Sequence, residues 1–218
     1  VPQGLEEQLI ARVVSETQSM YPNITENTDY AGVFDERHFA RLQGYIDDAV
    51  AKGAKLTIVG ADKTRASEGN RRMPLHILQN VTEDMQVMHE EIFGPILPVM
   101  TYSDITEVPD KIEPRRNPLA LYYFGKDKAE QEYLLNHVPS GGACINDITL
   151  HYVQEDLPFG GVGASGMGAY HGPEGFRNMS HGRAIYSQTM IDILPIIGAR
   201  PPFGEKFRKN IAKILGAI

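Results

Sequence analysis

The sequence predicts an α/β protein with a largely parallel sheet flanked by helices. Three observations lead to this class. Several segments have apolar residues at helical spacing, short β-prone runs alternate with them, and glycine, proline or polar residues separate the two. Strands that alternate with helices usually pair in parallel. The 218 residues contain no internal repeat and no long linker, so we expect one domain over residues 1–218.

Four segments have apolar residues three or four positions apart, as in an amphipathic helix. They are residues 5–20, 35–52, 126–137 and 203–215. Asp35 is the expected N-cap of the second helix and Gly53 its stop. We expect residues 106–116 to be helical only in part, because Pro109 and Pro114 interrupt them.

Six short runs rich in apolar and β-prone residues are the expected strands. They are residues 56–59, 75–78, 95–102, 119–124, 143–146 and 183–188. The last run, Arg183 to Gln188, would add a C-terminal strand before the final helix. Residues 147–175 show little periodicity and much glycine, so we expect long functional loops there.

The composition excludes several classes of protein. A net charge of −7 argues against a nucleic-acid-binding surface, which needs basic residues to neutralise phosphates. The single cysteine, Cys144, leaves no internal disulfide and no paired-cysteine metal site, which suits a reducing, cytoplasmic location. No apolar run approaches the length of a membrane span, and no signal peptide opens the chain. An acidic enzyme of small molecules is the simpler interpretation.

Three features suggest chemistry that their context does not support. Residues 161–166 match the dinucleotide-binding pattern G-x-G-x-x-G. That pattern needs a strand before it and a helix after it, but residues 154–158 are a poor buried strand and residues 167–173 a poor helix start. A tight glycine loop is therefore favoured over a dinucleotide-binding site. Cys144 lies in a strand-like run, where a small buried residue is commoner than a nucleophile. Residues 89–91 (His-Glu-Glu) lack the second histidine of a zinc helix, so no metal site is expected.

Two segments are more informative. In residues 90–95 (Glu-Glu-Ile-Phe-Gly-Pro), a carboxylate could accept hydrogen bonds from both hydroxyls of a ribose, and the phenyl ring could flank a planar heterocycle. By residue type alone, an exposed acid pair before a core phenylalanine is the commoner arrangement. In residues 157–161 (Leu-Pro-Phe-Gly-Gly), a rigid loop holds an aromatic residue that could line a pocket.

These two segments, about 65 residues apart, resemble the aldehyde dehydrogenase superfamily in order and spacing. Residues 117–124 and 140–146 resemble the strand–helix–strand region that connects the two motifs, and the resemblance covers nearly the whole chain. His151 and residues 159–172 are closest to the class 3 group, which includes fatty, aromatic and coniferyl aldehyde dehydrogenases. The resemblance implies the catalytic-domain fold of that family and the NAD(P)-dependent oxidation of an aldehyde to a carboxylic acid.

The family's site residues carry over only where the motifs match. The resemblance implies that Glu91 binds the nicotinamide ribose and that Phe93 packs near the nicotinamide. It implies that Phe159 lines the aldehyde tunnel, with His171 and Tyr152 as weaker candidates nearby.

The family's cysteine nucleophile, general-base glutamate and dinucleotide-binding domain would all lie before Val1. We therefore expect a piece of a longer protein that is inactive alone and binds NAD(P) weakly or not at all. Cys144 matches a strand position of the family, and Asn146 matches a position close to the site that is more plausibly structural.

The resemblance also implies a small-molecule aldehyde as substrate and a homodimer, in which residues 183–188 pair with strands of a neighbouring subunit. Coniferyl or another aromatic aldehyde is the expected substrate, and a long-chain aliphatic aldehyde is the competitor. NAD and NADP are not distinguished. The alternative function is a non-enzymatic binding or oligomerisation module derived from the family. A basic face of the last helix is expected to be solvated; it comprises Lys206, Arg208, Lys209 and Lys213.

Overall fold

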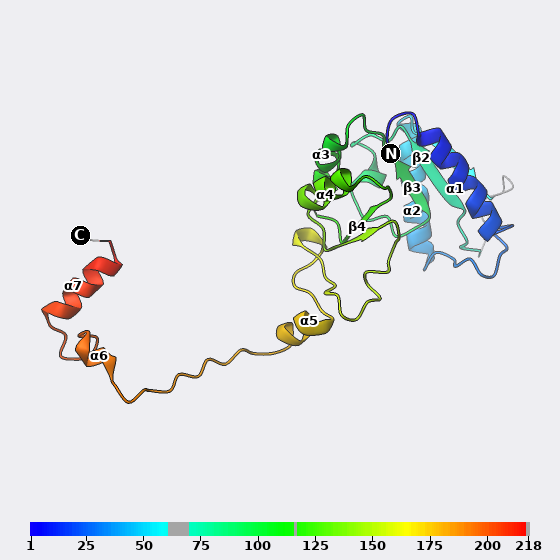
Figure 1. Cartoon of the computed structure of the whole chain (residues 1–218). Helices are drawn as coiled ribbons and strands as arrows, with labels where there is room; N and C mark the ends of the chain where they lie inside the picture. Colours follow the sequence, from blue (N-terminus) through cyan, green and yellow to red (C-terminus); the bar gives the residue numbers. More distant parts are fainter. Residues whose placement is uncertain (61–69, 116, 217–218) are drawn as a thin grey trace. The chain divides into compact units, whose positions relative to one another are not determined.

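The computed structural model describes residues 1–60, 70–115 and 117–216. Its contacts divide the chain into two units, Val1–Asn178 and Met179–Ile218, and each is described by itself (Figure 1). This division into contact units does not test whether residues 1–218 form one domain, so the expected single domain stays a prediction.

A three-stranded sheet forms the centre of the first unit. Its strands are β1 (Lys55–Val59), β2 (Leu75–Gln79) and β3 (Ile96–Val99), in the order β1-β2-β3. β1 runs antiparallel to β2, whereas β2 runs parallel to β3. Successive side chains of a strand point to opposite faces, so Ile77 and Leu78 of β2 pack on different sides, and both are fully buried. Burial on both faces is typical of a central strand, and here it extends to the polar residues His76 and Gln79.

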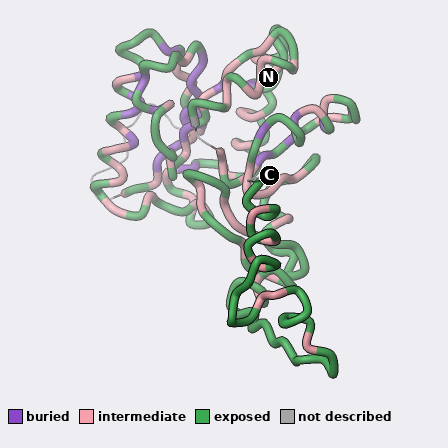
Figure 2. Tube along the Cα trace, turned by 90° about the vertical axis from the view of Figure 1, so that its left-hand side faces the viewer, coloured by how far each residue is buried: buried purple, intermediate pink, exposed green. Residues whose placement is uncertain are grey.

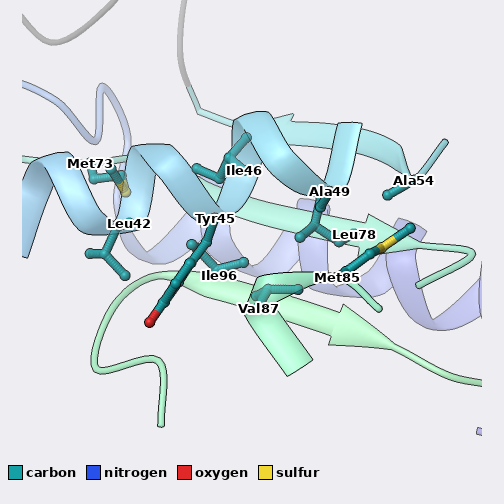
Figure 3. Close-up of a cluster of buried hydrophobic side chains, with 10 residues drawn as sticks. All are labelled: Leu42, Tyr45, Ile46, Ala49, Ala54, Met73, Leu78, Met85, Val87 and Ile96. Atoms are coloured by element: carbon teal, nitrogen blue, oxygen red, sulfur yellow. The ribbon is translucent and has the colours of Figure 1, made fainter. Parts of the chain in front are cut away.

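Helix α2 (Glu36–Ala51) packs on the Leu78 face of this sheet (Figure 3). The side chain of Asp35 caps the helix by accepting a hydrogen bond from the backbone N–H of His38 at 2.7 Å. The core cluster between helix and sheet consists of Leu42, Tyr45, Ile46, Ala49, Ala54, Met73, Leu78, Met85, Val87 and Ile96. Met85 and Val87 belong to the turn at η1 (Gln86–Met88) that leads towards β3.

Helix α1 (Glu6–Met20) covers the opposite face, where Ile10 packs with Val59, Ile77 and Val99. The first unit thus has a helix on each face of its larger sheet, and most of its buried residues lie there (Figure 2). The segment after β3 pairs with the first residues of the chain, through a parallel bridge between Pro2 and Tyr102.

A smaller sheet consists of β4 (Ala120–Tyr123) and β5 (Gly142–Ile145), which are parallel and joined by α4 (Lys128–His137). Leu121 and Tyr123 of β4 pack against Leu134 of α4 and the following Val138. The remaining short helices of this unit are η2 (Ile105–Glu107), α3 (Val108–Ile112), η3 (Glu113–Arg115), η4 (Gly163–Ser165) and α5 (Gly172–Asn178).

The second unit contains α6 (Ile193–Ile196) and α7 (Glu205–Ile214). The rings of Phe203 and Phe207 lie 4.5 Å apart, and the side-chain amide of Asn210 donates to the Ile197 carbonyl at 2.9 Å. Between residues 179 and 216 no residue is buried. Across the described part of the chain, no helix combines the length and the apolar character that a membrane crossing needs.

The α/β class is confirmed, as are all four predicted helices and the first five predicted strands, with ends that shift by a few residues. Two of the three strand pairings are parallel, but they belong to two sheets rather than one. Within the single chain, the predicted strand at Arg183 to Gln188 is wrong. A strand needs a neighbour for its backbone N–H and C=O groups, and no other described segment pairs with this one.

Replacing the buried Ile77 by alanine should lower the free energy of unfolding by about 2–4 kcal/mol, because it leaves a cavity between α1 and the central strand. The same substitution at Ile58, which is 49% exposed on the neighbouring strand, should cost less than about 1 kcal/mol. Urea unfolding with an unchanged m-value measures both. Equal losses would contradict the assigned core.

Candidate functional site

The loop of residues 89–95 lies between η1 and β3 and rests on α2. Arg41 of α2 donates to the Glu91 carbonyl at 3.3 Å and to the Ile92 carbonyl at 2.7 Å. It also donates to the hydroxyl of Tyr45 at 2.9 Å, and its guanidinium lies 5.1 Å from the centre of the Tyr45 ring. One side chain therefore ties two successive carbonyls of the loop to the helix.

Two further contacts fix the same loop. The Tyr45 hydroxyl donates to a carboxylate oxygen of Glu90 at 2.7 Å. Burial raises the pKa of Tyr45, and the hydrogen bond to Glu90 raises it further. Gly94 lies so close to α2 that a Cβ there would come within 2.3 Å of Leu42 Cδ1. Glycine at this position lets the loop approach the helix.

Glu91 and Phe93 point away from these contacts. The Glu91 side chain is exposed, and its carboxylate has no hydrogen-bond or ion-pair partner within the described ranges. Phe93 is 75% exposed and has a φ of +48°, in the left-handed region that phenylalanine rarely adopts. A strained backbone that presents an aromatic ring to solvent is typical of a binding site.

The three other predicted site residues, Phe159, Tyr152 and His171, lie close together. The ring centre of Phe159 lies 5.6 Å from that of Tyr152 and 6.5 Å from that of His171. Tyr170 and His151 complete the group at 5.7 Å and 5.8 Å. We call these five residues the ring cluster. Within the described residues, no recorded contact joins it to Glu91 or Phe93.

Local backbone pairing holds the ring cluster. Phe159 and Tyr170 exchange two N–H···O hydrogen bonds, each of 2.9 Å, in an isolated antiparallel bridge. His171 follows with a φ of +74°, which turns the chain into α5. The amide of Tyr152 donates to the Thr149 carbonyl at 2.9 Å, so this ring belongs to a turn beside the bridge.

The glycines of this region permit close backbone contacts. A Cβ on Gly141 would lie 2.1 Å from the Gly160 carbonyl oxygen, and one on Gly160 would lie 2.0 Å from that of Gly168. Within the motif of residues 161–166, a Cβ on Gly161 would lie 2.1 Å from the Ser165 carbonyl oxygen. No strand leads directly into this motif, since residues 146–160 form none, and the next α-helix begins only at Gly172, so the predicted tight glycine loop is confirmed.

Sequence reasoning missed the structural importance of His151. Its ring lies between Tyr122 of β4, at 5.9 Å, and Phe159, and it fills the space beside Gly142. Both ring nitrogens are buried and have no hydrogen-bond partner among the described residues. The class 3 resemblance includes His151, but its loop has no periodicity from which the position of the ring could be predicted.

Sequence reasoning also missed Arg41, although a signal was available. Arg41 and Tyr45 are four residues apart in a predicted helix and therefore lie on one face. That spacing predicts their mutual contact, but not that both reach a loop some fifty residues later.

Comparison with known proteins identifies the family. The profile of the aldehyde dehydrogenase family matches residues 1–185. A protein of Caulobacter vibrioides named "Probable coniferyl aldehyde dehydrogenase" is 43% identical over 97% of this chain. The coniferyl aldehyde dehydrogenase of Pseudomonas sp. (strain HR199) is 36% identical over 99% of it. The chain belongs to the aldehyde dehydrogenase family.

The structures agree with this assignment. The substrate-bound AldH of Staphylococcus aureus is 33% identical, and its chain superposes on 98% of this one with a TM-score of 0.77. Our aldehyde dehydrogenase chain covers 45% of that protein, and 44% and 45% of the two curated relatives. It thus spans less than half of their length.

Cys144 and Asn146 of this aldehyde dehydrogenase chain have structural surroundings. Cys144 lies within β5, opposite Tyr122 of β4, as the sequence predicts for a strand residue. Asn146 lies just after β5, where its side-chain amide makes reciprocal hydrogen bonds of 2.8 Å and 2.9 Å with the backbone of Gly125. These bonds tie the ends of the two strands together.

Three surface depressions of the described chain are lined by residues outside these two loops. One of them, of about 570 Å³, is formed by residues that follow β2 and β3 together with parts of η2, α3 and η3, and it includes none of the five predicted site residues. Within the described ranges no group of three His, Cys, Asp or Glu side chains could hold a metal ion. The candidate site consists of the loop of residues 89–95 and the loop of the ring cluster, and each contains a non-glycine residue with a positive φ, Phe93 and His171.

Replacing Gly141 by alanine should lower the free energy of unfolding by about 1–3 kcal/mol, because the new methyl group meets two backbone carbonyl oxygens. Gly44 in α2 is a matched control: a Cβ there meets nothing within 4 Å, so Gly44→Ala should raise the free energy of unfolding by about 0.5–1 kcal/mol. Thermal or urea unfolding measures both. Opposite signs are expected, and a harmless Gly141→Ala would contradict the close glycine contact.

Proposed function

We propose that this chain forms the nicotinamide-facing and aldehyde-facing side of an NAD(P)-dependent aldehyde dehydrogenase that oxidises an aldehyde to a carboxylic acid. The observation that carries the proposal is the loop of residues 89–95, where an unpartnered carboxylate and an exposed ring occupy a conformation fixed from α2. Membership of the aldehyde dehydrogenase family supports it.

The residues on this loop fit a nicotinamide nucleotide. The Glu91 carboxylate can accept hydrogen bonds from two ribose hydroxyls, and it has no described partner to displace first. The exposed Phe93 ring can flank the planar nicotinamide. When bound, NAD(P)+ supplies the hydride acceptor of the oxidation. Neither residue distinguishes NAD from NADP.

The ring cluster fits the aldehyde. Phe159, Tyr152 and His171 would line its path, exclude water and present ring faces to an aromatic substrate. The names of two relatives favour coniferyl aldehyde, and an aromatic substrate is the one that such a cluster suits. Long-chain aliphatic aldehydes are the competing class.

The nucleophilic cysteine thiolate and the glutamate that activates water are proposed to come from sequence outside these 218 residues, because Cys144 is a strand residue tied to β4. The chain alone is then inactive and binds NAD(P) weakly. We also propose a cytoplasmic homodimer, in which the unpaired residues 183–188 add to the sheet of a neighbouring subunit.

In the complete enzyme, Glu91→Gln should raise the Kd for NAD(P)+ about tenfold, because the amide is a weaker acceptor for ribose hydroxyls than the carboxylate. Isothermal titration calorimetry measures the change. Glu132→Gln, on the exposed surface of α4, removes the same charge elsewhere and should leave the Kd unchanged. Equal affinities in both variants would remove Glu91 from the cofactor site.

Phe159→Leu should lower the ratio of kcat/KM for coniferyl aldehyde over hexanal about fivefold, because leucine keeps the apolar volume but lacks a ring face. Steady-state kinetics of the complete enzyme measures the ratio. Phe34→Leu is the control, since Phe34 is 82% exposed and its recorded ring contact is to His38 rather than to the ring cluster. An unchanged ratio for Phe159→Leu would contradict an aromatic-lined aldehyde path.

A further inference from the structure

Arg41 is more heavily engaged with the loop than its position on a helix surface requires. Its guanidinium reaches three acceptors: the Tyr45 hydroxyl and the carbonyls of Glu91 and Ile92. The carboxylate of Glu90 lies a further 3.8 Å from one of its nitrogens. A planar fork of donors suits such divergent acceptors, whereas a lysine ammonium on a flexible stem would not hold them in one geometry.

These contacts act on the backbone that orients Glu91 and Phe93. The two carbonyls that Arg41 holds belong to Glu91 itself and to Ile92, the residue just before Phe93. Fixing these peptide groups limits the directions in which both side chains leave the loop. It also opposes relaxation of Phe93 out of its left-handed conformation, which by itself is unfavourable.

We propose that Arg41 is a positioning residue for the cofactor site, which holds Glu91 and Phe93 in their binding orientation without touching the cofactor. The inference rests on the proposed function, since it assumes that Glu91 contacts the nicotinamide ribose. Binding is weaker when a loop must first be ordered, so a loop held in place in advance increases affinity for the nucleotide.

A purely structural role is the competing explanation, and Arg37 provides a matched control. Arg37 lies one turn earlier on α2, is exposed, and within the described part of the chain has no hydrogen bond or ion pair with the loop. Arg37→Met and Arg41→Met remove the same charge from the same helix and leave similar apolar stems. Only the second removes the donors to residues 91 and 92.

In the complete enzyme, Arg41→Met should raise the Kd for NAD(P)+ about tenfold, the size of effect expected when charged hydrogen bonds are lost. Arg37→Met should leave the Kd unchanged, and the two unliganded variants should melt within a few degrees of each other. Arg41→Lys should give an intermediate Kd. Titration calorimetry and thermal melting provide the two readouts.

The double variant Arg41→Met/Glu91→Gln separates positioning from an independent effect. If Arg41 acts through Glu91, the fold increase in Kd of the double variant should stay well below the product of the fold increases of the two single variants. A full product, or an unchanged Kd in Arg41→Met beside a raised Kd in Glu91→Gln, overturns the inference and leaves the proposed function intact. If neither single variant changes the Kd, the assignment of Glu91 is wrong and both proposals fail.

Hydrogen exchange of the 218-residue chain gives a test that needs no activity. Arg41→Met should speed exchange of the amides of residues 89–94 and leave those of β2 protected, whereas Arg37→Met should change neither. Unchanged exchange in the loop would show that Arg41 does not hold it.

Discussion

The packing of α2 against β2 and β3 is the contact on which the candidate cofactor site depends. Leu42 is fully buried in the core between helix and sheet, and the same side chain limits how closely Gly94 can approach. Tyr45 likewise belongs to the core while its hydroxyl reaches Glu90. A rotation of α2 would therefore shift core and loop together, because close-packed interiors transmit such displacements.

The smaller sheet supports the ring cluster in a different way. One side of β4 is covered, since Leu121 and Tyr123 pack against α4. The next side chain, Tyr122, points to the other side and contacts His151, which in turn contacts Phe159. Because successive side chains of β4 point to opposite sides, this one strand contacts both the core beside α4 and the ring cluster. The hydroxyl of Tyr123 donates to Glu130 of α4, and burial together with this bond raises the pKa of Tyr123 to about 12.

Much of the fold could be predicted because its elements are locally consistent. Helical spacing and the Asp35 cap were sufficient for α2, and the strand-like run at residues 75–78, with three aliphatic residues of four, was sufficient for the buried strand. The segment 183–188 has a strand-like composition, but pairing depends on a neighbour that composition does not supply. The division into two sheets could not be predicted from the sequence, because it depends on which strand edges pair in three dimensions.

The candidate site was predicted through motifs, whereas its physical support was not. Residue types at 91, 93 and 159 suggest binding chemistry, but Arg41 acts across some fifty residues of sequence, and no local pattern encodes that distance. The ring cluster has the same character, since Phe159 meets Tyr170 through a bridge across a glycine-rich loop.

Both loops break local rules where they present side chains to solvent or to other rings. Phe93 and His171 have left-handed backbones, a conformation that costs free energy for residues with a Cβ. Each directly precedes a glycine in a close contact: Gly94 packs against Leu42, and a Cβ on Gly172 would lie 3.0 Å from the Asp156 carbonyl oxygen. Contacts elsewhere must offset that cost, and Arg41 and the Phe159–Tyr170 bridge are such contacts. Sequences that otherwise follow local preferences tend to depart from them at functional sites, so this shared pattern is itself an argument that both loops serve binding.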